Sequence, residues 1–164
     1  MSHEIASLLR KAYSLAQTKS SDPLTKNGAI LINSIGQQIG EGANCFPDKV
    51  CMSHERLQRP NKYDYLIHAE QNAIAQAARS GHSTANSTLV CPWAACSACA
   101  RLIIQAGITK VIAHKALMQQ SHNQWVDDIH KAHTMFREAQ IEYIEYAGNV
   151  GDVEHMFNGK IWQP

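Results

Sequence analysis

Two short stretches, His68-Ala69-Glu70 and Cys96-Ser97-Ala98-Cys99, decide how this chain is expected to fold. Each stretch follows an extended or turn-like segment and opens a predicted helix, so an imidazole and two thiols would meet at neighbouring helix N-termini. One histidine and two cysteines suit tetrahedral Zn²⁺ and leave its fourth position for water, as in a catalytic zinc site. The sequence therefore predicts His68, Cys96 and Cys99 as zinc ligands.

Glu70 stands two residues after the predicted histidine ligand. Water activated by a metal needs a nearby group that takes its proton and passes it on, and a carboxylate can do both. Taken singly, Cys-x-x-Cys also occurs in closed zinc sites and redox pairs, and His-x-Glu also occurs by chance. In this order the residues form the signature of the zinc nucleobase deaminases, so Glu70 is the predicted catalytic residue.

Hydrophobic periodicity predicts the elements around these two stretches. An amphipathic helix is expected over about residues 3–19, followed by a hairpin of two strands at 28–32 and about 38–43. Further strands are expected at 88–91, 109–113 and 141–146, and further helices at about 68–79, 96–106 and 123–140. Strands that alternate with helices after a hairpin predict an α/β fold, a three-layer α-β-α sandwich around a five-stranded mixed sheet.

The chain of 164 residues is predicted to form a single domain over residues 1–164, with a C-terminal tail from about 147 to 164. The tail has no clear periodicity and would dock on the body or on a neighbouring subunit. The irregular stretch 44–61 is expected to form a wall of the site. Its residues Cys45, Cys51 and His54 are candidates for a second, structural zinc, but no fourth ligand is evident, so one zinc is expected.

Composition bounds the partners of the protein. With a net charge of +1, the chain lacks a basic field that would attract a polynucleotide, so a small substrate is expected rather than nucleic acid. No apolar run approaches the roughly 20 residues of a membrane span, and the start of the chain lacks the regions of a signal peptide. The odd count of five cysteines is a poor disulfide framework. We therefore expect a cytoplasmic protein that does not contact a membrane.

From about Ser20 to Tyr146 the chain resembles the cytidine and deoxycytidylate deaminase superfamily, most closely its deoxycytidylate (dCMP) deaminases. The resemblance lies in SDPLTKNGA at 21–29, GANCFP at 42–47, HAEQNAI at 68–74 and CARLIIQAGI at 99–108. It implies a cytidine deaminase-like fold with His68, Cys96 and Cys99 as zinc ligands and Glu70 as proton shuttle. It further implies substrate contacts from Asn44 and from the Ala69 backbone, and a homo-oligomer, either a dimer or a hexamer.

The activity that this resemblance implies is hydrolysis of dCMP, or of dCMP with a substituent at C5, to the uracil counterpart with release of ammonia. A 5′-phosphate needs cationic partners, and Lys26 and Lys115 are predicted for this role from their positions near strand ends. The alternatives are a deaminase of a free base, a nucleoside or a tRNA base, and a zinc-scaffold subunit without activity. The near-neutral charge argues against tRNA, and the intact Glu70 argues against the scaffold.

The chain departs from the family pattern at four places that bear on the preferred base. The family usually has Pro-Cys before the x-x-Cys, but here Ala94 and Ala95 precede Cys96 and Ser97 follows it, so the ligands are kept while the loop around them differs. Asn27 stands where a valine is common, and Ala43 replaces a tyrosine. Trp93 either resizes the base pocket or, as is more frequent for a tryptophan at a strand end, packs in the core.

Overall fold

The structure is a computed structural model that describes residues 2–164. Within these residues the centre is a five-stranded sheet in the order β2-β1-β3-β4-β5. Its strands are β1 (Gly28–Ile32), β2 (Gln38–Ala43), β3 (Thr88–Val90), β4 (Lys110–His114) and β5 (Glu142–Tyr146). Strand β1 pairs antiparallel with β2 and β3, whereas β3, β4 and β5 run parallel. The predicted mixed sheet is confirmed.

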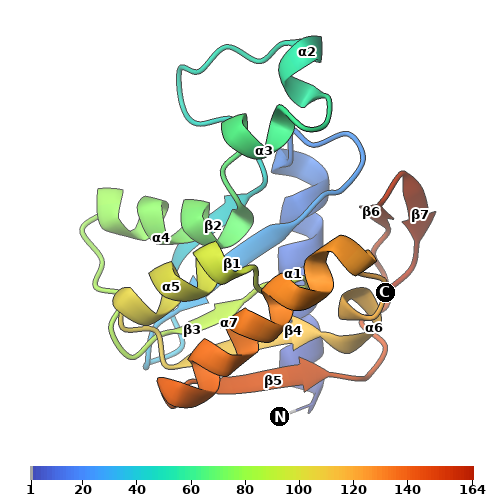
Figure 1. Ribbon diagram of the computed structural model, residues 1–164. Helices are drawn as coiled ribbons and strands as arrows, with labels where there is room; N and C mark the ends of the chain where they lie inside the picture. The colour runs from blue at the N-terminus through green and yellow to red at the C-terminus, as the bar shows by residue number, and fades with distance from the viewer. Residues whose placement is uncertain (1) are drawn as a thin grey trace.

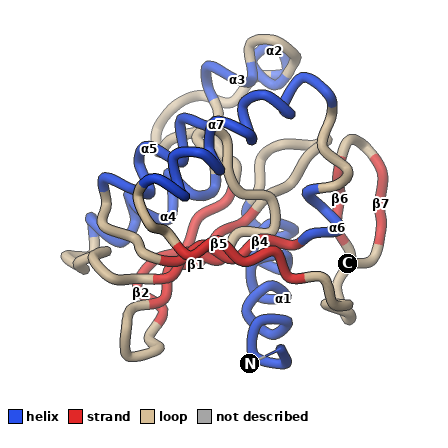
Figure 2. Tube along the Cα trace, turned by 60° about the horizontal axis from the view of Figure 1, so that its bottom comes forward, coloured by secondary structure: helices blue, strands red, loops and turns tan. Residues whose placement is uncertain are grey.

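Helices cover both faces of this sheet (Figures 1 and 2). One face carries α1 (Ser2–Lys19), which buries Leu9, Tyr13 and Ala16 on one side of an amphipathic helix. The opposite face carries α4 (Ala69–Arg79), α5 (Ser97–Gln105) and α7 (Val126–Glu138). The three-layer α-β-α architecture is thus confirmed. No helix within residues 2–164 combines the length and the apolar character that crossing a membrane requires.

Helix α4 lies directly on β2 because both surfaces are built from small residues. A Cβ atom added at Gly40 would lie 2.5 Å from the Ala73 carbonyl oxygen, and one added at Gly42 would lie 2.6 Å from the Ala69 carbonyl oxygen. Any larger side chain at these two positions would push the helix off the sheet. This close contact fixes the N-terminus of α4, where His68 and Glu70 stand.

The irregular stretch before His68 contains two short helices that periodicity could not predict, α2 (His54–Leu57) and α3 (Lys62–Tyr65). A further short helix, α6 (Lys115–Met118), follows β4, and a 3₁₀ turn, η1 (Asn123–Trp125), precedes α7. Helices of three or four residues present no repeating apolar face, so the hydrophobic pattern carries no signal for them.

The C-terminal tail forms a hairpin of β6 (His155–Phe157) and β7 (Lys160–Trp162), which docks on the body beside α1 (Figure 1). Arg10 of α1 donates from Nη2 to the Val150 carbonyl oxygen at 2.6 Å and from Nε to the Gly151 carbonyl oxygen at 3.1 Å. The Tyr13 ring packs edge-on against His155, with 4.7 Å between ring centroids. Of the two docking sites predicted for the tail, the one seen in the structure is the body of the same chain.

Candidate active site

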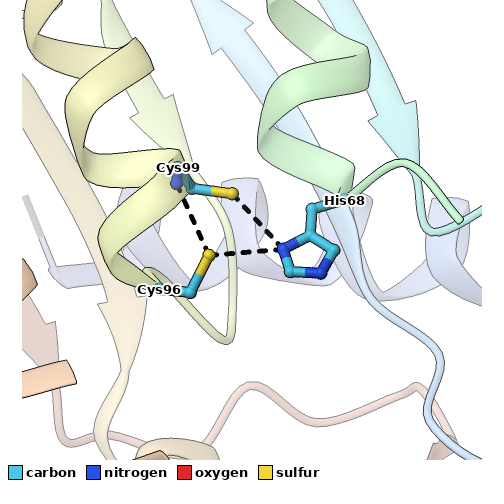
Figure 3. A group of neighbouring side chains, drawn as sticks. All are labelled: His68, Cys96 and Cys99. Atoms are coloured by element: carbon cyan, nitrogen blue, oxygen red, sulfur yellow. Dashed lines mark hydrogen bonds between the residues drawn. The ribbon is translucent and has the colours of Figure 1, made fainter. Parts of the chain in front are cut away.

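The three predicted metal ligands lie together where α4 and α5 begin (Figure 3). His68 is the N-cap residue of α4, Cys96 is the N-cap residue of α5, and Cys99 lies in the first turn of α5. His68 Nδ1 lies 3.4 Å from Cys96 Sγ and 3.4 Å from Cys99 Sγ. Within residues 2–164, these three side chains form the group of histidine, cysteine or acidic residues that could hold a metal ion. Their ligand atoms all lie within 4.8 Å of one another.

The spacing of the three ligand atoms fits tetrahedral zinc. Bonds of about 2.0 Å to nitrogen and about 2.3 Å to sulfur at tetrahedral angles put the two donor atoms about 3.5 Å apart. The observed separations of 3.4 Å match this value for both sulfurs. One imidazole and two thiolates leave one tetrahedral position for a ligand from solvent or substrate, which distinguishes a catalytic zinc site from a closed structural one.

The local backbone holds the two cysteines in place. The Cys99 amide donates to Cys96 Sγ at 3.4 Å, so the thiol caps its own helix. Asp128 of α7 accepts from the Ser97 amide at 2.8 Å and from the Ser97 hydroxyl at 2.6 Å, which fixes the first residue of α5. The positive end of the α5 dipole also favours negatively charged sulfur at this position.

Hydrogen bonds among the three ligand side chains shift their pKa values, and metal binding would change their protonation. A hydrogen bond with the Cys99 side chain lowers the pKa of Cys96 to about 4, and the same bond raises the pKa of Cys99. Burial lowers the pKa of His68, but the bond to Cys96 and the charge of Glu70 outweigh burial and raise this pKa to about 9. Because zinc binds thiolates and neutral imidazole, loading the site displaces protons from Cys99 and His68.

Glu70 lies in the first turn of α4 and is 1% exposed. Burial raises the pKa of this carboxyl to about 7, against the opposing charge of His68. Its Oε1 atom is buried and has no hydrogen-bond partner within the described chain. A buried carboxyl with a free oxygen beside the ligand group can accept a proton and donate it again at neutral pH.

A cavity opens beside His68 and Glu70. Its walls come from the loop before β1, the 44–66 stretch, Trp93, the turn at 122–125 and the C-terminal hairpin, which contributes Phe157 and Asn158. Arg59 and His122 line both this cavity and an adjoining surface depression, so they stand where the cavity opens to solvent. The stretch 44–61 thus contributes to a wall of the site, and so does the tail.

Asn44 lines the cavity, as its predicted role in substrate contact requires. Its Oδ1 accepts a hydrogen bond from the Ala69 amide at 3.0 Å, so the two predicted contact residues are joined to each other. The Asn44 amide donates to the Asn27 carbonyl oxygen at 3.0 Å, which ties this turn to the start of β1. Asn44 therefore links the first strand to the helix that carries Glu70.

The two lysines predicted to contact phosphate do not line the cavity. Lys26 lies between Thr25 and Asn27, which do line the cavity, but its own side chain donates to the Gln17 carbonyl oxygen at 3.0 Å. Lys115 is exposed at the start of α6. The cationic residues that line the cavity are Arg59 and Lys62, which sequence reasoning missed because their stretch has no periodic signal.

Cys45, Cys51 and His54 do not gather into a second metal site. Cys45 Sγ accepts a hydrogen bond from Asn72 Nδ2 at 3.2 Å, whereas Cys51 and His54 are exposed and His54 Nε2 pairs with Gln58 at 3.3 Å. The described residues hold no further group of three candidate ligands besides His68, Cys96 and Cys99.

Trp93 both lines the cavity and packs against the core. Its Nε1 donates to Ser121 Oγ at 2.7 Å, and its ring meets Trp125 edge-on with 5.8 Å between centroids. Trp125 meets Tyr63 in the same manner at 5.8 Å. The three rings form an aromatic wall that links the end of β3 to α3 and η1.

Comparison with known proteins gives a family for this arrangement. Residues 2–115 match the family described as the cytidine and deoxycytidylate deaminase zinc-binding region. The human deoxycytidylate deaminase is 34% identical over 104 residues, which are 60% of this chain and 57% of that protein. An uncharacterized deaminase in the luxG 3′ region of Aliivibrio fischeri is 32% identical over 123 residues, which are 75% of this chain and 80% of that protein. The chain thus spans little more than half the length of the curated deoxycytidylate deaminases that it matches.

Solved structures share the fold. The dCMP deaminase of cyanophage S-TIM5 in complex with dCMP and dUMP superimposes with a TM-score of 0.65 at 23% identity, covering 85% of this chain and 93% of that one. Its apo form gives a TM-score of 0.62 at 26% identity, covering 85% and 95%. Residues 2–115, which match the family, contain His68, Glu70, Cys96 and Cys99. This chain belongs to the cytidine and deoxycytidylate deaminase family, whose zinc-binding region it carries over residues 2–115.

Proposed function

We propose that the protein is a zinc-dependent hydrolase that deaminates a cytosine deoxynucleotide, converting dCMP or a C5-substituted dCMP to its uracil counterpart with release of ammonia. Membership of the deaminase family supports the reaction, and relatives named deoxycytidylate deaminase support the nucleotide. The single observation that carries the proposal is the buried Glu70 carboxyl, with its free Oε1, beside a tetrahedral set of one imidazole and two thiols.

His68, Cys96 and Cys99 would hold the metal, and the Glu70 carboxyl would move the protons. When bound, zinc supplies Lewis-acid activation of the attacking water. Glu70 takes a proton from this water and delivers it to ring N3, while the water oxygen forms a bond to C4. Glu70 then carries the second proton to the departing amine, and the C4–N bond breaks to give ammonia and the C4 carbonyl. One cytosine and one water become one uracil and one ammonia.

The walls of the cavity support a nucleotide as the ligand rather than a free base. Aromatic side chains line the side near Trp93 and Trp125, where a flat base or a sugar can pack. At the mouth, Arg59 and His122 provide hydrogen-bond donors, and they also line the adjoining depression, which none of the metal ligands lines. Because guanidinium groups bind phosphate oxygens through charge-assisted hydrogen bonds, we assign the 5′-phosphate to this mouth.

The setting of the enzyme is part of the same proposal. All layers pack around one sheet, which supports a single domain with the tail docked on it. The five free cysteines and the thiol-rich metal site support a reducing compartment such as the cytoplasm. The family resemblance supports a homo-oligomer, either a dimer or a hexamer, in which each chain acts on a free nucleotide.

The test is a panel of substrates assayed for ammonia release, together with measurement of metal content. The panel holds dCMP, 5-methyl-dCMP, CMP, deoxycytidine, cytosine and a tRNA, and the protein is loaded with one zinc per chain. The proposal expects release from a deoxynucleotide at a kcat/KM at least tenfold above that for deoxycytidine and cytosine. Preferred release from tRNA or a free base would overturn the substrate, and zinc-loaded protein without any release would identify a scaffold.

A further inference from the structure

The side chain of Asn27 has an unusual hydrogen-bond arrangement in the cavity wall. Asn27 immediately precedes β1, is 4% exposed and lines the same cavity as His68 and Glu70. Its Nδ2 donates to the Trp93 carbonyl oxygen at 2.9 Å and to Cys91 Sγ at 3.2 Å. Both amide hydrogens are therefore used, and turning the amide over would set its oxygen against the Trp93 carbonyl. The orientation of the side chain is fixed by its neighbours.

The other end of this amide is unsatisfied. Asn27 Oδ1 is buried and has no hydrogen-bond partner among residues 2–164. A buried acceptor without a partner loses the hydrogen bonds it would make in water, which is why such atoms are rare in folded proteins. Since the residue lines a cavity with a candidate catalytic group, a ligand can supply the missing donor.

Asn27 lines the cavity but not the adjoining surface depression, which Arg59 and His122 also line, so we place it at the inner end of the cavity. Its carbonyl oxygen accepts from the Asn44 amide at 3.0 Å, and Asn44 Oδ1 in turn accepts from the Ala69 amide at 3.0 Å. Two hydrogen bonds thus connect Asn27 to the residue directly before Glu70. Cys91, which accepts from Asn27 Nδ2 at 3.2 Å, is fully buried. Arg59 and His122, by contrast, are exposed at the opening.

In the proposed function the base lies beside Glu70, with its amine-bearing edge toward that carboxyl. We propose that Asn27 is a specificity-determining residue whose Oδ1 accepts a hydrogen bond from a donor on the C4–C5 edge of the pyrimidine. Two groups can supply this N–H or O–H donor, the exocyclic amine at C4 and the hydroxyl of a hydroxymethyl substituent at C5. The inference rests on the proposed function, because it takes a cytosine nucleotide as the ligand.

The chemistry of the reaction gives this contact a consequence for the product. After deamination, C4 carries a carbonyl oxygen, which is an acceptor like Asn27 Oδ1. If the amine is the donor, two acceptors face each other in the product complex, and the product binds more weakly than the substrate. If the C5 hydroxyl is the donor, substrate and product keep the same contact, and selectivity appears between C5 substituents instead.

The test measures equilibrium binding, which separates it from turnover. Glu70→Ala in its zinc-loaded form serves as the background, so that dCMP is not consumed during titration calorimetry. Dissociation constants are compared for dCMP, dUMP, 5-methyl-dCMP and 5-hydroxymethyl-dCMP, with Asn27 intact and with Asn27→Val. The matched control is Asn72→Val, since Asn72 Nδ2 also donates to a carbonyl oxygen and a thiol, Ala43 O at 3.1 Å and Cys45 Sγ at 3.2 Å, but does not line this cavity.

With Asn27 intact, the proposal expects a preference of about five- to tenfold, either for dCMP over dUMP or for 5-hydroxymethyl-dCMP over 5-methyl-dCMP. Asn27→Val removes that preference, and Asn72→Val leaves it unchanged. If Asn27→Val removes the preference for dCMP over dUMP, the amine is the donor. If it removes the preference for 5-hydroxymethyl-dCMP over 5-methyl-dCMP, the hydroxyl is the donor. The absence of a preference with Asn27 intact overturns the proposal without any variant at this position, and where Asn27→Val does not fold, Asn27→Ala takes its place in the comparison.

Three results would overturn the inference: no preference in the protein with Asn27 intact, ratios that Asn27→Val leaves unchanged, or no binding of any of the four nucleotides. Ammonia release by the wild-type enzyme is measured separately. If the wild-type enzyme releases ammonia but Asn27→Val leaves the binding ratios unchanged, the role of Asn27 is overturned and the proposed function stands. Asn27-dependent binding ratios in a protein whose wild type releases no ammonia from any substrate uphold the recognition and overturn the proposed function.

Discussion

Lys62 Nζ donates to Asp22 Oδ2 over 2.6 Å in the wall of the cavity, and each side chain is only 4% exposed. The second carboxylate oxygen of Asp22 accepts from the amides of Leu24 and Thr25 at 2.9 and 3.1 Å. This ion pair joins the loop before β1 to α3 and so holds two walls of the cavity together. Its two members stand 40 residues apart in the chain.

Replacing Lys62 by methionine is expected to lower the free energy of unfolding by about 3–5 kcal/mol, because Asp22 would remain as a buried charge without its partner. Unfolding in urea, monitored by circular dichroism, gives this difference. The double variant Asp22→Asn with Lys62→Met should regain part of the loss, since no charge is then left unpaired.

The exposed ion pair between Lys19 and Glu41, at 2.5 Å with side chains 59% and 40% exposed, is the matched control. Lys19→Met should change stability by less than about 1 kcal/mol, since solvent screens such pairs. Equal losses for the two lysine variants would contradict the importance assigned to burial.

Asp128 is expected to act on metal affinity without touching the metal. Its carboxylate accepts two hydrogen bonds from Ser97, the residue between Cys96 and the rest of α5. Asp128→Ala should loosen the start of this helix and weaken zinc binding by about 10- to 100-fold, the usual effect of losing a group that orients ligands. Competition with a chromophoric chelator measures the affinity. The exposed neighbour Asp127 gives the control, Asp127→Ala, and equal zinc affinities in both variants would refute the role of Asp128.

The sequence predicted the sheet and its covering helices well because strong local signals mark them. Strands β1 and β2 begin and end where expected, since turn residues from Asn33 to Gly36 separate two runs with clear patterns. The metal ligands were predicted from their residue types, their positions at predicted helix starts and their order in the deaminase signature, and the structure brings the three side chains together where α4 and α5 begin.

Side-chain direction and long-range partners were beyond such signals. Lys26 bonds to the Gln17 carbonyl oxygen and does not line the cavity, and the sequence of a loop does not reveal in which direction a side chain points. Lys62 and Arg59 lie in a stretch without periodicity, and the partner of Lys62 is set by tertiary contact. The free oxygen of Asn27 depends on what the Trp93 carbonyl and Cys91 already accept, which only coordinates reveal.

Glu70→Ala is expected to retain zinc and fold but to lose turnover by at least the 10²–10⁴-fold typical of general acid–base groups. The carboxyl lies beside the ligand group without belonging to it, so its removal deletes the proton carrier and leaves the three ligands in place. Ammonia release under saturating dCMP gives kcat, and metal analysis gives zinc per chain. Turnover near that of the wild type would exclude Glu70 from proton transfer, and loss of zinc would assign it a structural part.

Acidification is expected to destabilise the body through His155 of β6, which is fully buried with neither ring nitrogen hydrogen-bonded in the described chain. Burial, followed by the nearby His114 and Lys26, lowers the pKa of His155 to about 4. In the unfolded chain this histidine has its ordinary pKa, about 6.5. Its contribution to the free energy of unfolding, on the order of 3 kcal/mol, is therefore fully present above pH 6.5 and is lost as the pH falls toward 4. Urea unfolding at pH 7.5 and 5 measures the loss. His155→Phe should flatten this dependence, and an undiminished slope in that variant would point to other groups.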